Sequence, residues 1–291
     1  MSASSSGTGA VAVGVGVNLT LAVVKTAVGL IGDSQALVAD GIESTTDIVG
    51  SLIVWSGLRI SAKPADDVHP YGHGKAESLA AALASLALLA AAAYIAVESI
   101  HQIRVPHEPP AWFTLPVLIA TVAVKEALFR FVGNTSTELG STALHVDAWH
   151  HRSDALTSLA VLIGIVVSLF GGYAAADDWA ALAACLVIAY NGVTLFRSAL
   201  SEIMDASVDD PTLDAIRRHA AEVPGVVQIE KMRVRKSGLG LFMDIHVQVD
   251  ENLSVRQGHN IGGAVKAHLL GGSWKIVDVV VHIEPLEIHG G

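Results

Sequence analysis

Residues 79–97 read LAAALASLALLAAAAYIAV, a run without a single charged side chain. A helix rises about 1.5 Å per residue, so a run of this length covers roughly the 30 Å hydrocarbon thickness of a bilayer. Uncharged apolar runs of this length are typical of membrane-spanning helices. The stretch therefore predicts a transmembrane helix, which we place at residues 76–101.

The whole chain shares this character, because 52% of its 291 residues are hydrophobic and only 16% are charged. The mean hydropathy of +0.52 is too high for an ordinary soluble domain. Charged residues crowd into short stretches that separate apolar runs of about 20 residues, the length of a transmembrane helix. These runs predict an all-α bundle of six spans at 10–32, 36–60, 76–101, 111–133, 142–170 and 176–200.

The distribution of basic residues predicts the orientation of the bundle. Those on one side are Arg59, Lys63, Lys75, Lys125 and Arg130. The loops on the opposite side carry only Arg104. Because Lys and Arg are enriched in cytosolic loops, we expect both termini to lie in the cytosol.

The composition changes near residue 205, where charged residues return and apolar runs shorten. We expect a transmembrane domain at 1–204 and a small cytosolic α+β domain at 205–291. A domain of about 85 residues buries a modest core, so dimerisation or bound metal is an expected source of further stability. Hydrophobic periodicity predicts the order αββαβ, with elements at 212–221, 228–235, 241–249, 255–270 and 277–283.

The net charge and the number of cysteines argue against nucleic-acid-binding and disulfide-bonded proteins. The net charge of −10 argues against nucleic-acid binding, and the sequence has no basic stripe interleaved with aromatic residues. The single cysteine, Cys185, lies in an apolar span and has no partner for a disulfide. We interpret it as a packing residue.

Two of the predicted spans carry polar residues with the same spacing of three and then four. The second span has Asp40, Glu43 and Asp47, and the fifth has Asp147, His150 and Asp154. This spacing places each set on one face of its helix. Ionisable groups within a span are costly unless they face a partner or an aqueous cavity, so they mark a functional site by default.

Four of these residues lie at similar depth, and we expect them to meet near the middle of the membrane as a transport site: Glu43, Asp47, His150 and Asp154. Carboxylates and one imidazole suit tetrahedral Zn²⁺ and also harder divalent ions. A hydrogen-bonded packing cluster is the alternative. For Asp40 and Asp147, packing is the preferred interpretation and a place on the entry path is the other. Lys25, in the first span, has no partner that the sequence identifies.

Further groups of potential metal ligands lie outside the spans. The loop after the second span contains Asp66, His69 and His73. These are ordinary Zn²⁺ ligands, although exposed histidine-rich loops also occur without metal. The C-terminal domain contains Glu230, His246, His259, His282 and Glu284. The last two alternate on one predicted strand and share a face, but spacing alone leaves surface histidines as the alternative.

Three stretches resemble the cation diffusion facilitator family of divalent metal transporters. They are ALVADGIESTTD at 36–47, HPYGHGKAES at 69–78 and HHRSD at 150–154. The last supplies the family's His-x-x-x-Asp pattern, and the likeness runs from the first span to His282. It is greatest to the bacterial zinc and iron exporters.

The resemblance implies a homodimer in the lipid of a bacterial inner membrane, which exports a divalent transition metal from the cytosol in exchange for protons by alternating access. It implies a transporter and no enzyme, with metal bound at the transport, loop and C-terminal groups named above. Zn²⁺ is the expected substrate. Zinc-transporting members usually have His or Asp where this chain has Glu43, so Fe²⁺, Mn²⁺, Co²⁺ and Cd²⁺ stay open. Glu230 and Glu284 replace a His and an Asp of the family pattern.

Two other classes also place polar residues in a membrane. An intramembrane metal-dependent hydrolase uses His and carboxylates around a metal-bound water, but the sequence contains no His-Glu-x-x-His motif. A proton or monovalent-ion antiporter needs buried carboxylates alone, and the histidines count against it. Binding of Zn²⁺ or Co²⁺ would separate the metal transporter from this last class.

Overall fold

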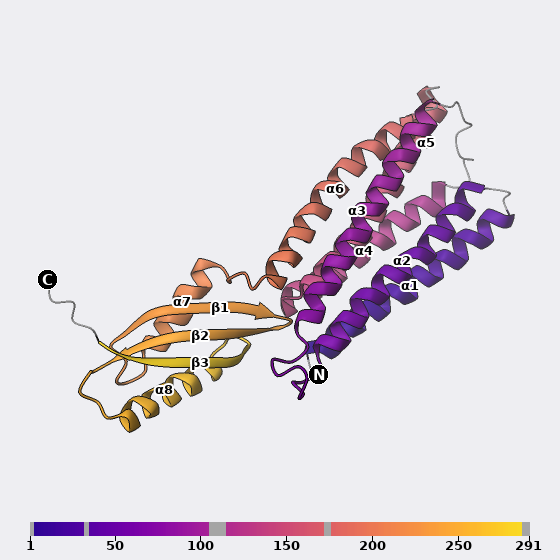
Figure 1. Ribbon diagram of the computed structural model, residues 1–291. Helices are drawn as coiled ribbons and strands as arrows, with labels where there is room; N and C mark the ends of the chain where they lie inside the picture. The colour runs from indigo at the N-terminus through magenta and orange to yellow at the C-terminus, as the bar shows by residue number, and fades with distance from the viewer. Residues whose placement is uncertain (1–2, 32–34, 105–114, 172–175, 287–291) are drawn as a thin grey trace. The chain divides into compact units, whose positions relative to one another are not determined.

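A computed structural model describes residues 3–31, 35–104, 115–171 and 176–286 (Figure 1). The chain divides into two compact units, Met1–Leu200 and Ser201–Gly291. The first unit is built from helices alone, and the second combines helices with a sheet.

Six long helices form the first unit, as the apolar runs predict. They are α1 (Ala3–Ile31), α2 (Gln35–Ser61), α3 (Lys75–Arg104), α4 (Leu115–Leu139), α5 (Thr142–Gly171) and α6 (Ala176–Ile203). The shortest has 25 residues and the longest 30, which gives roughly 37 to 45 Å at the usual helical rise. Each is long enough to cross a bilayer.

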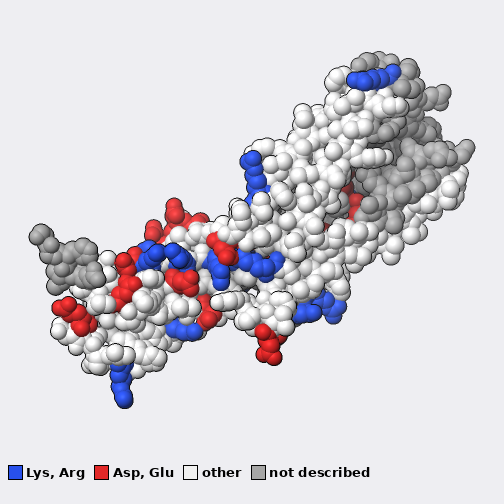
Figure 2. Space-filling view, in the orientation of Figure 1, with Lys and Arg blue, Asp and Glu red and all other residues white. Residues whose placement is uncertain are grey.

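The outer surface of these helices is apolar. Leu19, Leu83, Ile119 and Leu186 are large hydrophobic side chains that stay exposed, and on the face shown in Figure 2 this unit carries few charges. Two segments, Ser6–Val28 and Lys75–His101, have the length and hydropathy of a span by themselves, with mean hydropathies of 1.8 and 2.2. Such a surface matches lipid better than water.

Helix α4 continues to Leu139, beyond the end of the predicted span 111–133. The first residues of that predicted span, 111–114, lie outside the described part of the chain. In the polar last turns of α4, the Thr135 and Thr137 hydroxyls donate to carbonyls four residues earlier, at 3.1 and 3.0 Å, so these hydroxyls have partners within the helix. Gly140 then ends the helix with a φ of 68°, in the left-handed region that glycine tolerates. Hydropathy does not detect such an extension, because its side chains are hydrophilic.

The hairpin between α4 and α5 fixes the start of α5. Ser141 caps the helix, since its Oγ accepts from the Leu144 backbone N–H at 3.2 Å. The same hydroxyl donates to Glu77 Oε1 of α3 at 2.6 Å. Ser141 and Glu77 are both buried, so this bond ties α5 to α3 within the helical unit.

Helices α2 and α3 approach most closely at Gly57. A Cβ atom added to this glycine would collide with the Cβ of Ala80 and would lie 3.1 Å from the carbonyl oxygen of Ala76. Small residues at a helix crossing let the two backbones approach, which is a common feature of helices packed in membranes.

The second unit has the predicted αββαβ order. Its elements are α7 (Asp210–Ala221), β1 (Gln228–Ser237), β2 (Gly240–Val249), α8 (Val255–Leu270) and β3 (Ile276–Pro285). The sheet order is β1-β2-β3, with β1 and β2 antiparallel and β2 and β3 parallel. Ser254 and Gln257 form a capping box at the start of α8. The predicted order of elements is therefore confirmed in both units.

One face of the sheet packs against the helices. Ile245 and Val247 of β2 are fully buried in a core that also contains Val265 and Leu269 of α8. Because neighbouring strand residues point to opposite faces, His246 lies on the other side of the sheet. The sheet thus has a helix-covered face and an open face.

Candidate metal centres

Asp47 of α2 meets His150 and Asp154 of α5, with one ligand atom of each residue within 4.8 Å of the others. His150 Nε2 lies 3.2 Å from Asp47 Oδ1. Two ligands of a tetrahedral Zn²⁺ lie about 3.3 Å apart when each is 2.0–2.1 Å from the ion. The arrangement is therefore of the right size for one divalent ion.

Lys125 of α4 also contacts these residues, which the sequence does not predict. Its Nζ donates to Asp47 Oδ2 at 3.0 Å and to Asp154 Oδ2 at 2.6 Å. The side chain is 1% exposed. We interpreted Lys125 from the sequence as a marker of orientation, and this needs correction because the residue is buried against carboxylates. A lysine inside a predicted span is itself a signal for a polar site.

The structure describes the side chains of only some of the other polar residues in the predicted spans. The side chains of Glu43 and Asp40 lie outside the part of the chain that the structure describes. Asp147 is buried and accepts a hydrogen bond from Ser51 at 2.9 Å, in agreement with the packing interpretation. Lys25 donates to Ser44 at 3.1 Å, a partner that the sequence could not identify.

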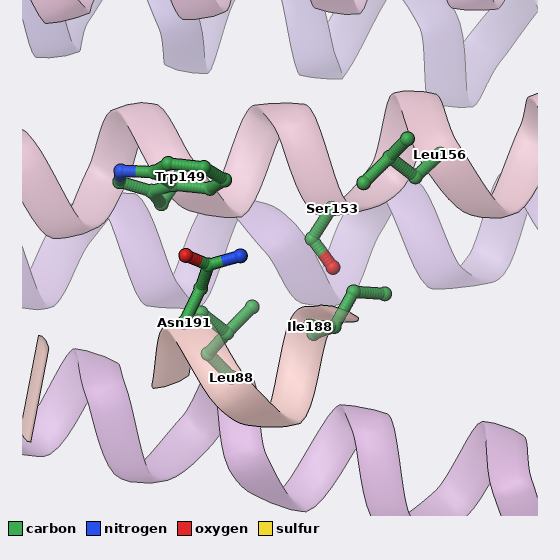
Figure 3. A pocket seen from close by; sticks show the side chains of 6 residues that line it. All are labelled: Leu88, Trp149, Ser153, Leu156, Ile188 and Asn191. Atoms are coloured by element: carbon green, nitrogen blue, oxygen red, sulfur yellow. The ribbon is translucent and has the colours of Figure 1, made fainter. Parts of the chain in front are cut away.

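A narrow pocket lies between α3, α5 and α6 (Figure 3). Its lining consists of Leu88, Trp149, Ser153, Leu156, Ile188 and Asn191. It has no room for a water molecule and includes none of the four predicted transport residues. The pocket is a seam of helix packing, and polar Ser153 and Asn191 give it no ligand set for a metal.

The loop between α2 and α3 brings Asp66, His69 and His73 together. His69 Nδ1 lies 3.2 Å from Asp66 Oδ1, and His73 Nε2 lies 3.6 Å from Asp66 Oδ2. The backbone N–H of His69 donates to Asp66, which lowers the pKa of this carboxyl. Asp66 is thus ionised at neutral pH and able to bind a cation.

A third group lies on the open face of the sheet and contains His246, His282 and Glu284. The two histidines are directly paired across β2 and β3. Glu284 Oε1 lies 2.6 Å from His246 Nδ1 and 3.4 Å from His282 Nε2. Glu230 approaches His246 at 3.9 Å. His259 is exposed on α8 and does not belong to this group among the described residues.

Glu230 reaches the open face because β1 has an irregularity there. The strand register shifts between Ile229 and Lys231, so Glu230 is the extra residue of a bulge, a feature that re-aims side chains. A hydrogen bond with Glu284 and repulsion from its charge raise the pKa of the Glu230 carboxyl. Two close carboxyl groups of this kind favour a bound proton or cation.

A fourth group was not anticipated and contains His219, Glu222 and His268. It joins the end of α7 to the last turn of α8. Sequence spacing gives only the neighbours His219 and Glu222, three residues apart. His268 comes from a distant part of the chain, so no local pattern could have revealed the group.

Comparison with known families covers almost the whole chain. The cation efflux transmembrane domain matches residues 11–204, and the cytoplasmic domain of cation efflux proteins matches residues 208–286. The chain is 29% identical over 267 residues to the manganese efflux system protein MneP of Bacillus subtilis, a match that covers 90% of each protein.

Other relatives come from distant organisms. The magnetosome protein MamB of Magnetospira sp. is 31% identical over 265 residues, covering 91% of this chain and 90% of MamB. Metal tolerance protein C1 of Arabidopsis thaliana is 31% identical over 282 residues, which is 91% of this chain and 59% of that protein. A solved C-terminal domain of MamM is 31% identical, with a TM-score of 0.26, over 27% of this chain and 98% of that domain.

The transmembrane match alone extends over more than half of the chain. The matched residues contain helices α2 and α5, which bring Asp47, His150 and Asp154 together. The protein belongs to the cation diffusion facilitator family of membrane transporters for metal cations.

Proposed function

We propose that the protein is a secondary active transporter that exports a divalent transition metal ion in exchange for protons. The observation that supports this proposal is that buried Asp47 meets partly buried His150 and Asp154 inside the helical unit. Glu43 completes the proposed transport site. The proposed domains are residues 1–204 in the membrane and 205–291 in the cytosol, with both termini cytosolic and a bacterial inner membrane as the location.

The chemistry of the donors explains the coupling to protons. Carboxylates and His150 bind a metal only when they are deprotonated, so arrival of the ion from the cytosol releases protons. Protons that enter from the opposite side compete for the same atoms and help to expel the ion. Helix movement that opens the site to one side at a time turns this competition into antiport.

Lys125 enters the same exchange as a cation that the metal ion displaces from the carboxylates. Its ammonium group already neutralises part of the charge of Asp47 and Asp154. A metal ion that binds both carboxylates must move this group aside. The empty site is therefore less negative than its carboxylates alone would make it, which lowers the cost of keeping it in a membrane.

Zn²⁺ is the proposed substrate, because one imidazole and several carboxylates form a tetrahedral set that suits this ion. Mn²⁺ is the second candidate. It is favoured by the similarity to a manganese efflux protein and by an oxygen-rich donor set.

The test is uptake of Zn²⁺ and Mn²⁺ by proteoliposomes under a pH gradient. Asp47→Ala and Asp154→Ala should each abolish uptake, whereas Glu138→Gln should transport normally because Glu138 is exposed at the end of α4. Zn²⁺ uptake that depends on Asp47 would establish a zinc antiporter. A preference for Mn²⁺ would reassign the substrate, and uptake of neither ion, with Fe²⁺, Co²⁺ and Cd²⁺ also inactive, would refute the proposal.

The two cytosolic groups are proposed as additional metal sites. The loop group Asp66, His69 and His73 can receive an ion before it enters the membrane. The group on the open face can join two protomers into a homodimer, with His246, His282, Glu284 and Glu230 as ligands and exposed His259 as a ligand only after rearrangement. Loss of one bound ion in Asp66→Ala and in His282→Ala, measured by equilibrium dialysis, would support each site.

A further inference from the structure

We propose that His219, Glu222 and His268 form a separate site for Zn²⁺ or a chemically similar divalent ion, which ties α7 to α8. The site lies in the second unit and takes no part in the proposed transport. It contains two imidazoles and one carboxylate, a donor set that is common in zinc proteins and leaves a fourth position for water.

The distances between the three side chains fit one shared ion. Glu222 Oε2 lies 3.2 Å from His219 Nδ1 and 3.5 Å from His268 Nε2. These separations bracket the value of about 3.3 Å expected for two ligands of a tetrahedral Zn²⁺. The imidazole rings are stacked, with centroids 3.9 Å apart and planes inclined by 24°. Two imidazoles bound to one tetrahedral ion have ring centroids about 5 Å apart, so the rings must turn out of this stack when an ion binds.

The nitrogen atoms of the two rings are incompletely satisfied. Nε2 of His219 and Nε2 of His268 are both buried, and neither has a hydrogen-bond partner within the described chain. An ion beside Glu222 would satisfy Nε2 of His268, whereas on His219 it would bind Nδ1, the ring nitrogen that lies next to Glu222. Neutral imidazoles bind a metal through a ring nitrogen, so two rings beside one carboxylate can share an ion.

The helices also favour a cation at this place. His219 lies in the last turn of α7 and His268 in the last turn of α8. The C-terminal end of a helix carries a partial negative charge, and here two such ends meet. Glu222 adds a full negative charge and is 65% exposed, so an ion can reach the group from solvent.

This site is distinct from the group on the open face of the sheet. Trp274 lies beside it, 5.4 Å from the His219 ring, and packs against the core that α8 and the sheet enclose. His246 and His282 lie on the side of the sheet that faces away from this core. An ion at His219 and His268 would therefore stabilise the helix layer of one protomer.

The competing interpretation is an ion-paired triad in which Glu222 simply holds two histidines. Binding of Co²⁺ distinguishes the metal site from the ion-paired triad, because the visible absorption of Co²⁺ reports its coordination directly. The experiment uses the full-length protein in detergent with the other three groups disabled by Asp47→Ala, Asp66→Ala and His282→Ala. We expect this protein to bind one Co²⁺ per chain and to gain thermal stability with Zn²⁺.

Adding His219→Asn and His268→Asn should remove the bound Co²⁺, its absorption and the stabilisation by Zn²⁺. Glu222→Gln is the second test, since its exposed side chain can change without disturbing the fold, and it should weaken Co²⁺ binding at least tenfold. Asp214→Asn removes the same charge from an exposed position of α7 and should bind Co²⁺ normally. Unchanged Co²⁺ binding in both the histidine and the Glu222 variants would overturn the proposal. None of these readouts depends on transport.

Discussion

Asp47 and Asp154 share one cation in the structure, the ammonium group of Lys125, at 3.0 and 2.6 Å. With Lys125 the three groups carry a net charge of −1, and without it they would carry −2. An incoming divalent ion therefore meets a site whose attraction is partly cancelled. At the scale of single residues, we therefore expect Lys125 to limit how tightly the proposed transport site holds its ion.

Replacing Lys125 by Met should tighten Zn²⁺ binding by at least about tenfold. A unit charge about 4 Å from another contributes about 4 kcal/mol at an effective dielectric constant of 20, so even partial loss of this repulsion is measurable. Turnover should fall, because the ion leaves more slowly and the empty site keeps unneutralised charge. Binding isotherms and uptake rates of the purified protein measure both effects.

Arg130→Met is the matched control for this prediction. Arg130 lies on the same helix, pairs with Glu126 and is 73% exposed, so its loss should leave Zn²⁺ affinity unchanged. Lys125→Arg keeps the charge and should bind more nearly like the natural protein. Equal Zn²⁺ affinity in Lys125→Met and the natural protein would show that the ammonium group does not compete with the metal.

His150 should set the preference between metals, because among the described candidate ligands Asp47, His150 and Asp154 it is the one that offers a nitrogen atom. His150→Asp gives an all-oxygen set, which favours Mn²⁺ over Zn²⁺ relative to the natural site. We expect the ratio of Zn²⁺ to Mn²⁺ uptake in a competition assay to fall by about tenfold, roughly 1.4 kcal/mol of discrimination. An unchanged ratio would mean that selectivity resides elsewhere in the site.

At the scale of elements, the start of α5 matters because this helix carries both His150 and Asp154. Ser141→Ala removes the helix cap and the hydrogen bond to Glu77. We expect a loss of about 2 kcal/mol in stability, since a cap contributes about 1 kcal/mol and a bond to a buried carboxylate a similar amount. Thermal unfolding in detergent measures it.

Thr137→Ala provides the comparison at the end of α4. Within the described ranges, the hydroxyl of this exposed threonine bonds only to its own helix, so its replacement should change the free energy of unfolding by less than about 0.5 kcal/mol. If both variants unfolded at the same temperature as the natural protein, the link between α3 and α5 would not be a determinant of stability.

The elements that could be predicted are those with strong local signals. Residues 255–270 form a helix within the predicted bounds because Ser254 and Gln257 provide a capping box and apolar residues recur on one face. The extension of α4 to Leu139 could not be predicted from hydropathy, because its last turns are polar. The bulge that re-aims Glu230 depends on pairing with β2, which local sequence does not specify.

Contacts between distant segments of the chain are the part of the candidate sites that is harder to predict from the sequence. The matching three-and-four spacing brought Asp47, His150 and Asp154 into one prediction, because two helix faces with the same pattern are expected to meet. Lys125 carried a signal that was assigned to orientation instead. His268 meets His219 only through the packing of α8 beside α7, and spacing contains no information about that contact.

At the scale of the whole molecule, the second unit has its own hydrophobic core, centred on Ile216, Ile245 and Val265. We therefore expect residues 205–291 to fold alone with a cooperative unfolding transition. Zn²⁺ should strengthen dimerisation of this fragment, because an ion that binds only the dimer shifts the equilibrium by mass action. Analytical ultracentrifugation with and without a chelator measures the dimer affinity.

His282→Ala should remove most of the metal effect on dimerisation, since His282 lies on the open face. His219→Asn should retain that effect, because its proposed ion stabilises the helix layer within one protomer. A dimer affinity that does not respond to chelation would contradict a role of the open face in assembly, while leaving the transport proposal untouched.

The close approach at Gly57 has a consequence for movement. Helices α2 and α3 touch there almost backbone to backbone, and any side chain larger than hydrogen would force them apart. Such a contact resists sliding but permits a change of angle, in the manner of a pivot. Asp47 lies on α2 ten residues before Gly57, so tilting α2 about this point would swing Asp47 along an arc while α3 stays in place. In the proposed transport cycle, the separation of Gly57 and Asp47 along α2 would then set how far the candidate site moves when the helix tilts.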